Sequence, residues 1–249
     1  MQDGLLAAPS ELYYPIRLKP RGLNSLLTLA ERGIDHIEIR CVDLNPLTGG
    51  LVDVRDVEFV HTLLAHIRLA TVGHIEYENC HPFTAADNCG RTWTLVHNGT
   101  IFNGTLLNDY VGILYGDTDS ERVLLHLVER INHAQNHLHR ALNEKERFDV
   151  LFTEIAVLAK RNKLNLLIFD GEVLYAHCNF RDTLHVCQEE DAVTFSTRAL
   201  SAGRWAPVPF TSLIAAKDGE IVRTSPPHGN EYIYNPDDYR LVYMDFARL

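Results

Sequence analysis

The order of the expected elements is what most constrains the fold of this chain. Residues 120–132 and 148–158 each place their apolar side chains on one helical face. After Lys163 the chain changes to short apolar runs separated by turn signals such as Asp170-Gly171. Strands, then two helices, then a run of strands favour an α+β layered domain over an alternating parallel one. The strands expected after the helices cover residues 164–170, 172–178, 192–197, 212–217, 220–224 and 241–246.

The part of the chain before the helices is predicted to contain short strands and loops. Residues 11–19 read as a strand, a short helix through Ala30 follows, and 36–44 alternates as a half-buried strand does. Residues 71–91 are rich in turn-forming residues and are expected to form loops. A strand at 93–96 ends at His97-Asn98-Gly99, where Asn-Gly is a strong turn signal.

The composition excludes several classes of function. The formal net charge of -10 repels phosphate backbones and anionic membranes, so neither nucleic acid nor a membrane is an expected partner. No stretch approaches the roughly 20 apolar residues of a membrane helix, and the first residues lack a signal-peptide pattern.

Five scattered cysteines without a CxxC pair indicate reduced thiols and a cytoplasmic location. His133, His137 and His139 cluster without a completing carboxylate or thiol, so no metal or cofactor is predicted.

Three short polar segments carry side chains suited to chemistry. Arg68 offers a planar fork for a carboxylate, and the alternative is a structural ion pair. Asn98 and Gly99 combine an amide donor with an unshielded backbone N–H, which suits an oxyanion; taken alone, an ordinary hairpin turn is the simpler explanation. Asp119 stands before a helix, where it either caps free N–H groups or receives an ammonium group.

Taken together, residues 65–249 resemble the class II glutamine amidotransferases of the N-terminal nucleophile hydrolase superfamily. The motifs that carry the resemblance are HIRLAT at 66–71, NCHPF at 79–83, HNG at 97–99 and TDSE at 118–121. Four ordered motifs within about sixty positions are far more specific than any one of them.

This resemblance implies an αββα sandwich, incomplete at its N-terminus here, that hydrolyses glutamine to glutamate and ammonia. It implies that Arg68 binds the α-carboxylate of glutamine and that Asp119 binds its α-amino group. Asn98 and Gly99 would form the oxyanion hole. The residues implied to line or support the pocket are Thr71, His97 and the segment 79–83.

The chain departs from the family pattern at the nucleophile. The family uses a cysteine exposed as residue one, whose own α-amino group serves as the base. Here Gln2 follows Met1, and the first cysteine is Cys41. Neither Cys41 nor Cys80 carries a free α-amino group, so both are expected to be structural thiols. We therefore expect a domain that binds glutamine or glutamate as a small-molecule ligand and is inactive in hydrolysis.

The first sixty residues carry a second resemblance. ELYYPIRLK at 11–19 and IEIRCVDLNPLTGG at 37–50 are similar to glutamate–cysteine ligase, which predicts a ligase-like fragment at 1–64 and an amidotransferase-like domain at 65–249. The ligase joins glutamate to cysteine with ATP and Mg²⁺, and its site needs ligands from the whole ligase fold. No ligase activity is expected from this fragment. A ligase remnant and a non-catalytic, self-associating interaction module or fusion product are the alternatives.

Overall fold

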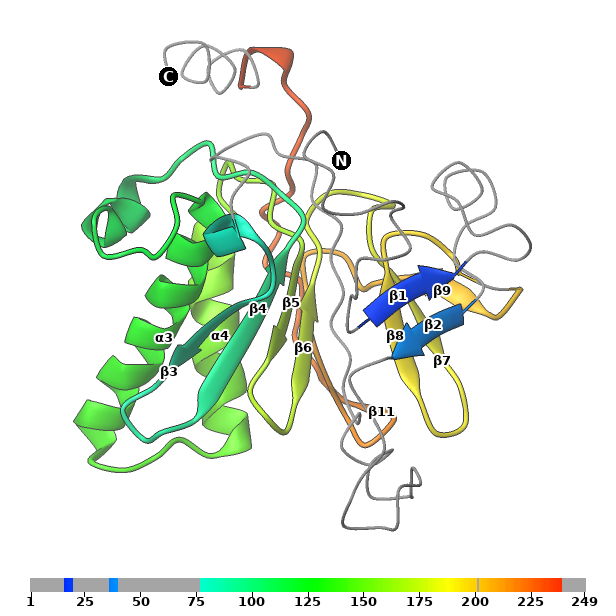
Figure 1. Cartoon of the computed structure of the whole chain (residues 1–249), viewed down its shortest axis with the longest axis horizontal. Coiled ribbons are helices and arrows are strands. Elements are labelled where there is room, and N and C mark those ends of the chain that lie inside the picture. Colours follow the sequence, from blue (N-terminus) through cyan, green and yellow to red (C-terminus); the bar gives the residue numbers. More distant parts are fainter. Residues whose placement is uncertain (1–15, 20–35, 40–76, 201, 239–249) are drawn as a thin grey trace, which may run out of the picture. The chain divides into compact units, whose positions relative to one another are not determined.

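The computed structural model describes residues 16–19, 36–39, 77–200 and 202–238. Strands β1 (Ile16–Lys19) and β2 (His36–Ile39) pair antiparallel and belong to one compact unit. The remaining described elements, from η3 to β11, belong to a second compact unit (Figure 1). No described helix is long and apolar enough to cross a membrane.

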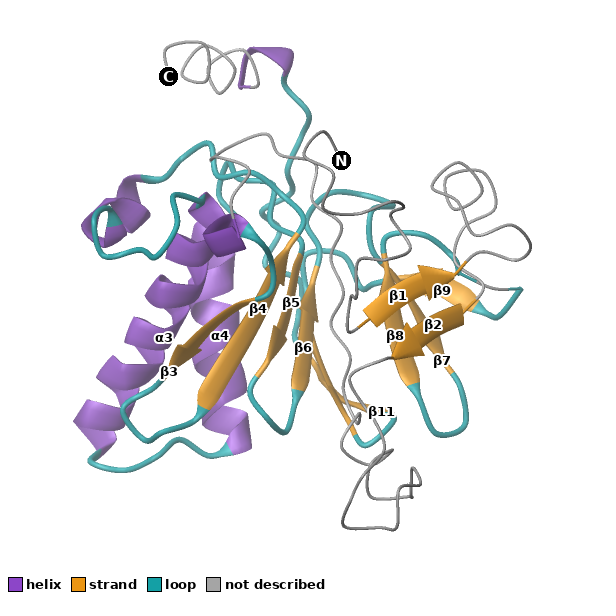
Figure 2. Cartoon of the chain, viewed as in Figure 1, coloured by secondary structure: helices purple, strands orange, loops and turns teal. Residues whose placement is uncertain are grey.

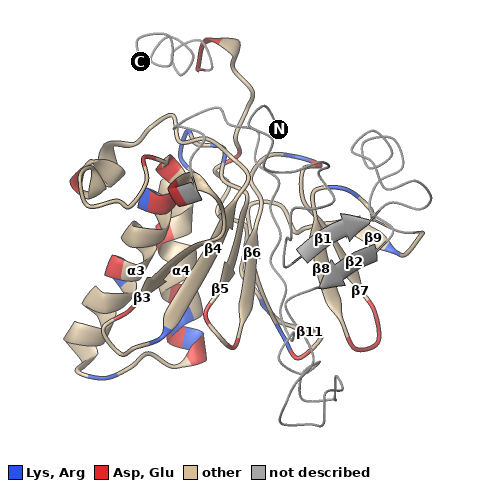
Figure 3. Cartoon of the chain, viewed as in Figure 1, with Lys and Arg blue, Asp and Glu red and all other residues tan. Residues whose placement is uncertain are grey.

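A six-stranded antiparallel sheet forms the centre of the second unit. Its strands lie in the order β11-β10-β6-β5-β4-β3, so that β6 and β5 occupy the middle (Figure 2). In Figure 3, β4, β5 and β6 are free of charged residues, as strands buried between two layers require. The bounds are β3 (Phe83–Ala86), β4 (Thr92–His97), β5 (Leu166–Phe169), β6 (Leu174–His177), β10 (Leu213–Lys217) and β11 (Glu220–Thr224).

Two helices, α3 (Asp119–Leu138) and α4 (Glu144–Leu158), cover one face of this sheet. The Thr118 side chain caps α3, and Asn143 forms a capping box at the start of α4, so both helices begin where backbone donors are satisfied. Their apolar faces pack with Trp93 and other sheet residues into the larger core. Loop helices η3 (Tyr77–Asn79) and η4 (Thr105–Tyr110) precede α3.

A second sheet lies against the other face of the first. It contains β7 (His185–Gln188) between β8 (Val193–Ser196) and β9 (Trp205–Pro207). Val186 and Phe195 of this sheet pack with Ala176 and Ile214 of the larger sheet in a second apolar cluster. The described layers are therefore helices, sheet and sheet.

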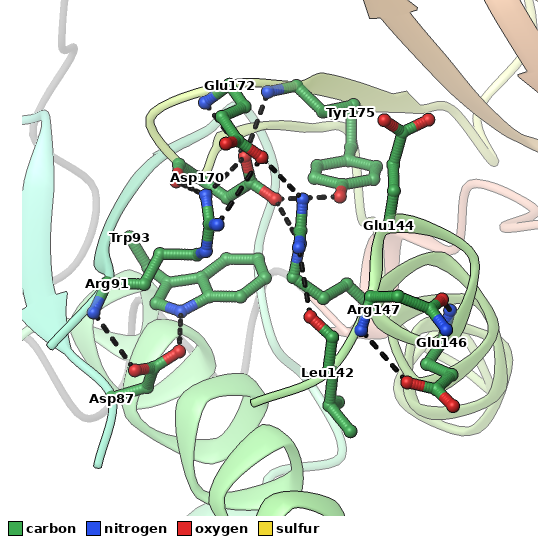
Figure 4. A network of polar contacts seen from close by, with 12 residues as sticks. Asp87, Arg91, Trp93, Leu142, Glu144, Glu146, Arg147, Asp170, Glu172 and Tyr175 are labelled. Carbon is green, nitrogen blue, oxygen red and sulfur yellow. Dashed lines mark hydrogen bonds and ion pairs between the residues drawn. The ribbon is translucent and has the colours of Figure 1, made fainter. Parts of the chain in front are cut away.

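A buried ion-pair network joins α4 to the turn between β5 and β6 (Figure 4). Asp170, fully buried after β5, accepts a hydrogen bond from Arg147 Nε of α4 at 2.7 Å and another from Tyr175 Oη at 2.9 Å. Arg91 lies on the other side of the carboxylate, and Glu172 pairs with both arginines. The carboxylate also accepts two backbone N–H groups of the turn. The Asp170 carboxylate thus accepts four hydrogen bonds, which compensate the cost of burying its charge.

The α+β class expected from the sequence is confirmed, as are both amphipathic helices. The helices are longer than expected: α3 runs to Leu138 rather than 132, and α4 begins at Glu144 rather than 148. The strands expected after the helices are present at β5, β6, β8, β10 and β11. The strand expected at 241–246 and the helix through Ala30 lie outside the described residues.

Residues 71–91, which were expected to be rich in loops, also contain a short strand where they are described. Phe83–Ala86 pairs with β4 as the edge strand β3. The four residues are too short and too weakly patterned to be recognised alone, and the partner strand supplies the hydrogen bonds that make them a strand. Strands β7 and β9 also had no corresponding prediction.

Candidate functional site

The candidate site is built where the chain leaves β4 and passes residues 163–165. The N–H of Asn98 donates to the carbonyl of Asn165 at 2.9 Å. Thr100 and Lys163 then exchange two backbone hydrogen bonds, of 2.9 and 3.1 Å. Backbone bonds on both sides therefore fix the position of Gly99.

Gly99 lies where no side chain can fit. A Cβ atom at this position would overlap the carbonyl oxygen of Lys163 and Nε2 of His97. Because the first of these belongs to the backbone, it cannot move aside as a flexible side chain would. The glycine is therefore required by the close approach of two chain segments.

His97 is buried between the two segments that approach each other. Its Nδ1 lies 3.0 Å from Oγ of Ser120, and its Nε2 lies 3.1 Å from the carbonyl oxygen of Lys163. Burial lowers the pKa of the imidazole, and the negative charge of Asp119 opposes that effect. The ring joins the backbone at Lys163 to the first turn of α3.

The segment 118–121 fastens two loops to the start of α3. Thr118 accepts the N–H of Glu121 as the helix N-cap. Asp119, also buried, accepts the N–H of Ile101 at 2.8 Å through Oδ2. Both carboxylate oxygens of Glu121 accept backbone N–H groups, those of Tyr115 and Gly116. Thr118, Asp119 and Glu121 thus each accept a backbone N–H group and hold the segment that carries it.

The segment 79–83 reaches the same loops. Asn79 is buried, and its Oδ1 accepts the N–H of Asp117 at 2.9 Å. Gly116 lies so close that a Cβ atom there would overlap Asn79 Oδ1. Phe83 continues from this segment into β3 and the larger core. Three of the four motifs recognised in the sequence therefore lie around the start of α3.

Two buried asparagines hold this arrangement, and the sequence reasoning did not identify either. Asn162 accepts the N–H groups of Phe102 and Asn103 at 2.8 and 2.7 Å, so it fixes the loop just after the bridge between Thr100 and Lys163. Asn179 accepts the N–H of Leu164 at 2.8 Å and donates to the carbonyl of Asn162 at 2.9 Å. The only signal in the sequence was their polarity beside apolar runs.

Two histidines add a further support for residues 163–165. His177 Nδ1 donates to the carbonyl of Leu164 at 2.7 Å, which leaves Nε2 as an acceptor for His228 Nε2 at 2.9 Å. His228 Nδ1 in turn accepts the N–H of Asn230. Each nitrogen has a partner only when both rings are neutral. Burial accordingly lowers the pKa of both histidines.

Two simpler interpretations of the motifs are wrong. The chain does not fold back in a hairpin at Asn98–Gly99, but continues beside Lys163 as an isolated bridge. The residue that caps α3 is Thr118, and Asp119 is the first residue of the helix. Neither motif is therefore explained by the local role that its sequence alone suggested.

The described site combines an exposed residue, Asn98, with a buried carboxylate of α3 that contacts the same loop. The carboxamide of Asn98 is exposed at the end of β4 and makes no hydrogen bond within the described ranges. Asp119 contacts the same loop three residues later, at Ile101. Such a site can donate to a developing oxyanion and accept from a cation. Among the described residues, no group of three metal-binding side chains accompanies it. Arg68, Thr71 and Cys41 lie outside the described residues.

Comparison with known proteins gives two family matches. A family model described as class-II glutamine amidotransferases matches residues 51–190, and a glutamate-cysteine ligase model matches residues 1–89. The two matches overlap between 51 and 89, so the boundary expected at 64/65 stays a prediction.

The similar curated proteins follow the same division. A Haemophilus influenzae protein provisionally named a glutamine amidotransferase is 32% identical over 117 residues, which are 47% of this chain and 38% of that protein. A bifunctional glutathione biosynthesis protein of Listeria monocytogenes is 35% identical over 65 residues, which are 26% of this chain and 8% of that protein. The chain thus spans less than half of the length of each of these relatives.

A solved structure supports the fold. The allosteric regulatory enzyme of purine biosynthesis superposes with a TM-score of 0.51 over 64% of this chain and 34% of that chain, at 18% identity. The fold is therefore of the N-terminal nucleophile hydrolase type, as the resemblance implied. The described ranges contain one of the two helical layers of the αββα sandwich.

Proposed function

Because the chain belongs to the class II glutamine amidotransferase family, we propose that it binds glutamine or glutamate at the loop that joins β4 to α3. Asn98 and Gly99 contact the side-chain carbonyl of the ligand, and Asp119 receives its α-amino group. Arg68 binds its α-carboxylate, with Thr71 beside it. His97 does not contact the ligand and holds the loop through its buried contacts with Ser120 and Lys163.

The observation that carries this proposal is the shared loop. Asp119 accepts the N–H of Ile101 through Oδ2 at 2.8 Å, while the carboxamide of Asn98 stays exposed on the same segment. A buried carboxylate is costly unless donors surround it, and a ligand ammonium group supplies the strongest such donor. An amide donor on the loop after β4 and a cation acceptor on α3 that holds the same loop match the two ends of glutamine.

We further propose that the 249-residue polypeptide binds glutamine without hydrolysing it. Family chemistry needs a thiolate and an α-amino group on one residue. The internal cysteines have no free α-amino group, and Cys178 is buried, so that the pKa of its thiol is raised. Cys80 and Cys89 are exposed and likewise internal. Binding and turnover are therefore separable in this chain.

A thermal-shift titration with ammonia detection tests both parts. Glutamine at about 100 times its dissociation constant should add about 2.7 kcal/mol to the free energy of unfolding. Asp119→Asn keeps an oxygen for the Ile101 N–H but removes the charge, so the ligand-induced shift should fall. Asp149→Asn, which changes an exposed aspartate of α4, should leave the shift unchanged.

The outcomes separate the two claims. If neither glutamine nor glutamate raises the melting temperature of the folded protein, the binding proposal is wrong. If glutamine binds and ammonia is released, binding stands and the claim of inactivity is wrong. Cys80, exposed in the segment that contacts the start of α3, would then be the first cysteine to replace.

The match of residues 1–89 to glutamate-cysteine ligase favours a second candidate, a ligase remnant. ATP consumption that requires both glutamate and cysteine would establish it. A third candidate is a self-associating module, favoured by exposed apolar side chains in η4 and between η4 and α3: Leu106, Val111, Ile113 and Tyr115. A monomer on sizing chromatography at high concentration would exclude this third candidate.

A further inference from the structure

A chain of polar contacts links the carboxylate of Asp119 to the backbone of Lys163. Ser120 Oγ lies 3.3 Å from Asp119 Oδ1 and 3.0 Å from His97 Nδ1. His97 Nε2 lies 3.1 Å from the carbonyl oxygen of Lys163. The side chains of Asp119, Ser120 and His97 are all buried. The contacts thus join the start of α3 to the segment that holds Gly99.

When the imidazole of His97 is neutral, its one ring proton and the hydroxyl proton of Ser120 are too few to make all three of these contacts hydrogen bonds. The carbonyl of Lys163 can only accept, so Nε2 must carry the ring proton, and Nδ1 must then accept. Nδ1 therefore takes the single hydroxyl proton of Ser120. Asp119 Oδ1 receives nothing from Ser120 in this state and is left to accept from another donor.

A protonated imidazole changes the direction of these contacts. Both ring nitrogens then donate, Nε2 to Lys163 and Nδ1 to Ser120. The Ser120 hydroxyl must turn toward Asp119 Oδ1, where it occupies the free lone pair. The imidazolium charge also offsets the charge of Asp119. The two states of the ring therefore differ in how available the carboxylate is to a cation.

We propose that His97 and Ser120 are positioning residues that tie the charge of His97 to cation binding at Asp119 through the direction of the Ser120 hydroxyl. This inference rests on the proposed function, in which Asp119 receives the α-amino group of the ligand. It assigns to His97 no contact with the ligand. A neutral His97 leaves Asp119 open, and a protonated His97 competes with the ligand ammonium.

The charged and titratable groups around His97 come from several elements. Asp119 of α3 favours the imidazolium, and the ammonium group of Lys163 opposes it. His177 of β6 is close enough for His97 to contribute to the lowering of the His177 pKa. Among the described residues, Asp119 is the negative group that acts on His97. Linkage then requires that a cation at Asp119 make His97 harder to protonate.

A pair of ligands separates this coupling from a purely structural role. Glutamine carries an α-amino group, and glutaramate is the same molecule without it. Loss of loop structure would weaken both ligands together. The coupling affects only glutamine, so the ratio of the two dissociation constants isolates it.

The experiment measures this ratio at several pH values, beside NMR of the imidazole nitrogens of His97 in the full chain. The neutral ring should carry its proton on Nε2. As pH falls through the titration of His97, the preference for glutamine over glutaramate should decrease several-fold in the wild type. His97→Gln should show a smaller decrease than the wild type over the same pH range. Ser120→Ala should show a smaller decrease than the wild type, and Ser120→Thr should restore it.

Each contrary result has a distinct meaning. A neutral ring protonated on Nδ1, or a ratio that stays constant while His97 titrates, overturns the coupling. If neither ligand binds, the proposed function fails, while the NMR still decides the contacts. In that case Asp119→Asn should lower the pKa of His97 further, because it removes the negative charge that favours the imidazolium. An unchanged titration would overturn the coupling without any ligand.

Discussion

Replacement of Arg147 by methionine tests whether the buried network of Figure 4 holds α4 on the sheet. The substitution removes three donors: Nε to Asp170 at 2.7 Å, Nη1 to the Leu142 carbonyl at 3.1 Å and Nη2 to Glu172 at 3.1 Å. Asp170 keeps two backbone N–H groups and the Tyr175 hydroxyl but loses its closest cation.

The expected loss follows from the burial of the pair. The Arg147 and Asp170 side chains are 4% and 0% exposed. Removal of one partner from a buried ion pair costs about 3–5 kcal/mol, because the remaining charge is left uncompensated. Arg91 lies 3.6 Å from the same carboxylate and is partly exposed, so it offsets only part of this cost. We therefore expect about 3 kcal/mol, a large share of the roughly 5–15 kcal/mol of a typical domain.

Urea denaturation, followed by the fluorescence of the buried Trp93, measures the effect. With a slope of about 2 kcal/mol per molar, a loss of about 3 kcal/mol lowers the midpoint by about 1.5 M. Arg140→Met is the matched control, because Arg140 pairs with Glu146 through two equally short hydrogen bonds on the surface. Equal losses in the two variants would refute the argument that burial gives the network its strength.

Three further predictions follow from the support of the site. Gly99→Ala should destabilise the protein by at least about 1–3 kcal/mol in urea denaturation, because the new methyl group meets a backbone carbonyl. Asn162→Ala should speed amide hydrogen exchange at Phe102 and Asn103 more than in α4, since it removes their acceptor. Burial lowers the pKa of His177 to about 3, so the unfolded chain binds a proton that the folded chain does not. His177 alone should therefore lower the unfolding free energy as pH drops below about 6.5, by at most about 1.4 kcal/mol per unit, and His177→Asn should remove that contribution to the slope.

The sequence predicted the parts of the fold that rest on local pattern. The apolar stripe of α3 is visible until Ile131, but the helix continues to Leu138 because polar residues also extend a helix on its exposed face. Its end is set by His139, whose left-handed backbone (φ 53°) terminates the hydrogen-bond ladder. A left-handed histidine gives no such signal in advance, in contrast to glycine.

The support of the site could not be predicted, because it depends on contacts between distant segments. The carbonyl of Lys163 is the acceptor for Thr100 and His97, yet a backbone carbonyl has no signature in a sequence. Asn162 and Asn179 act through their positions next to Leu164, which only the paired strands define. The motif residues could be recognised because their side chains are chemically distinctive. The groups that support them, two asparagines and a backbone carbonyl, occur in any protein and could not be recognised.

The motif at 118–121 presents one remaining problem of interpretation, since each of its residues also has a structural partner. Thr118 and Glu121 satisfy backbone N–H groups, and Asp119 satisfies the N–H of Ile101. An asparagine could accept that N–H equally well, without the cost of burying a charge. The hydrogen bond therefore explains why position 119 is polar, but it does not explain why the residue is an acid. The N-terminus of α3 favours an acid at its first residue, and in the proposed function the α-amino group of the ligand adds a cationic partner for the same charge.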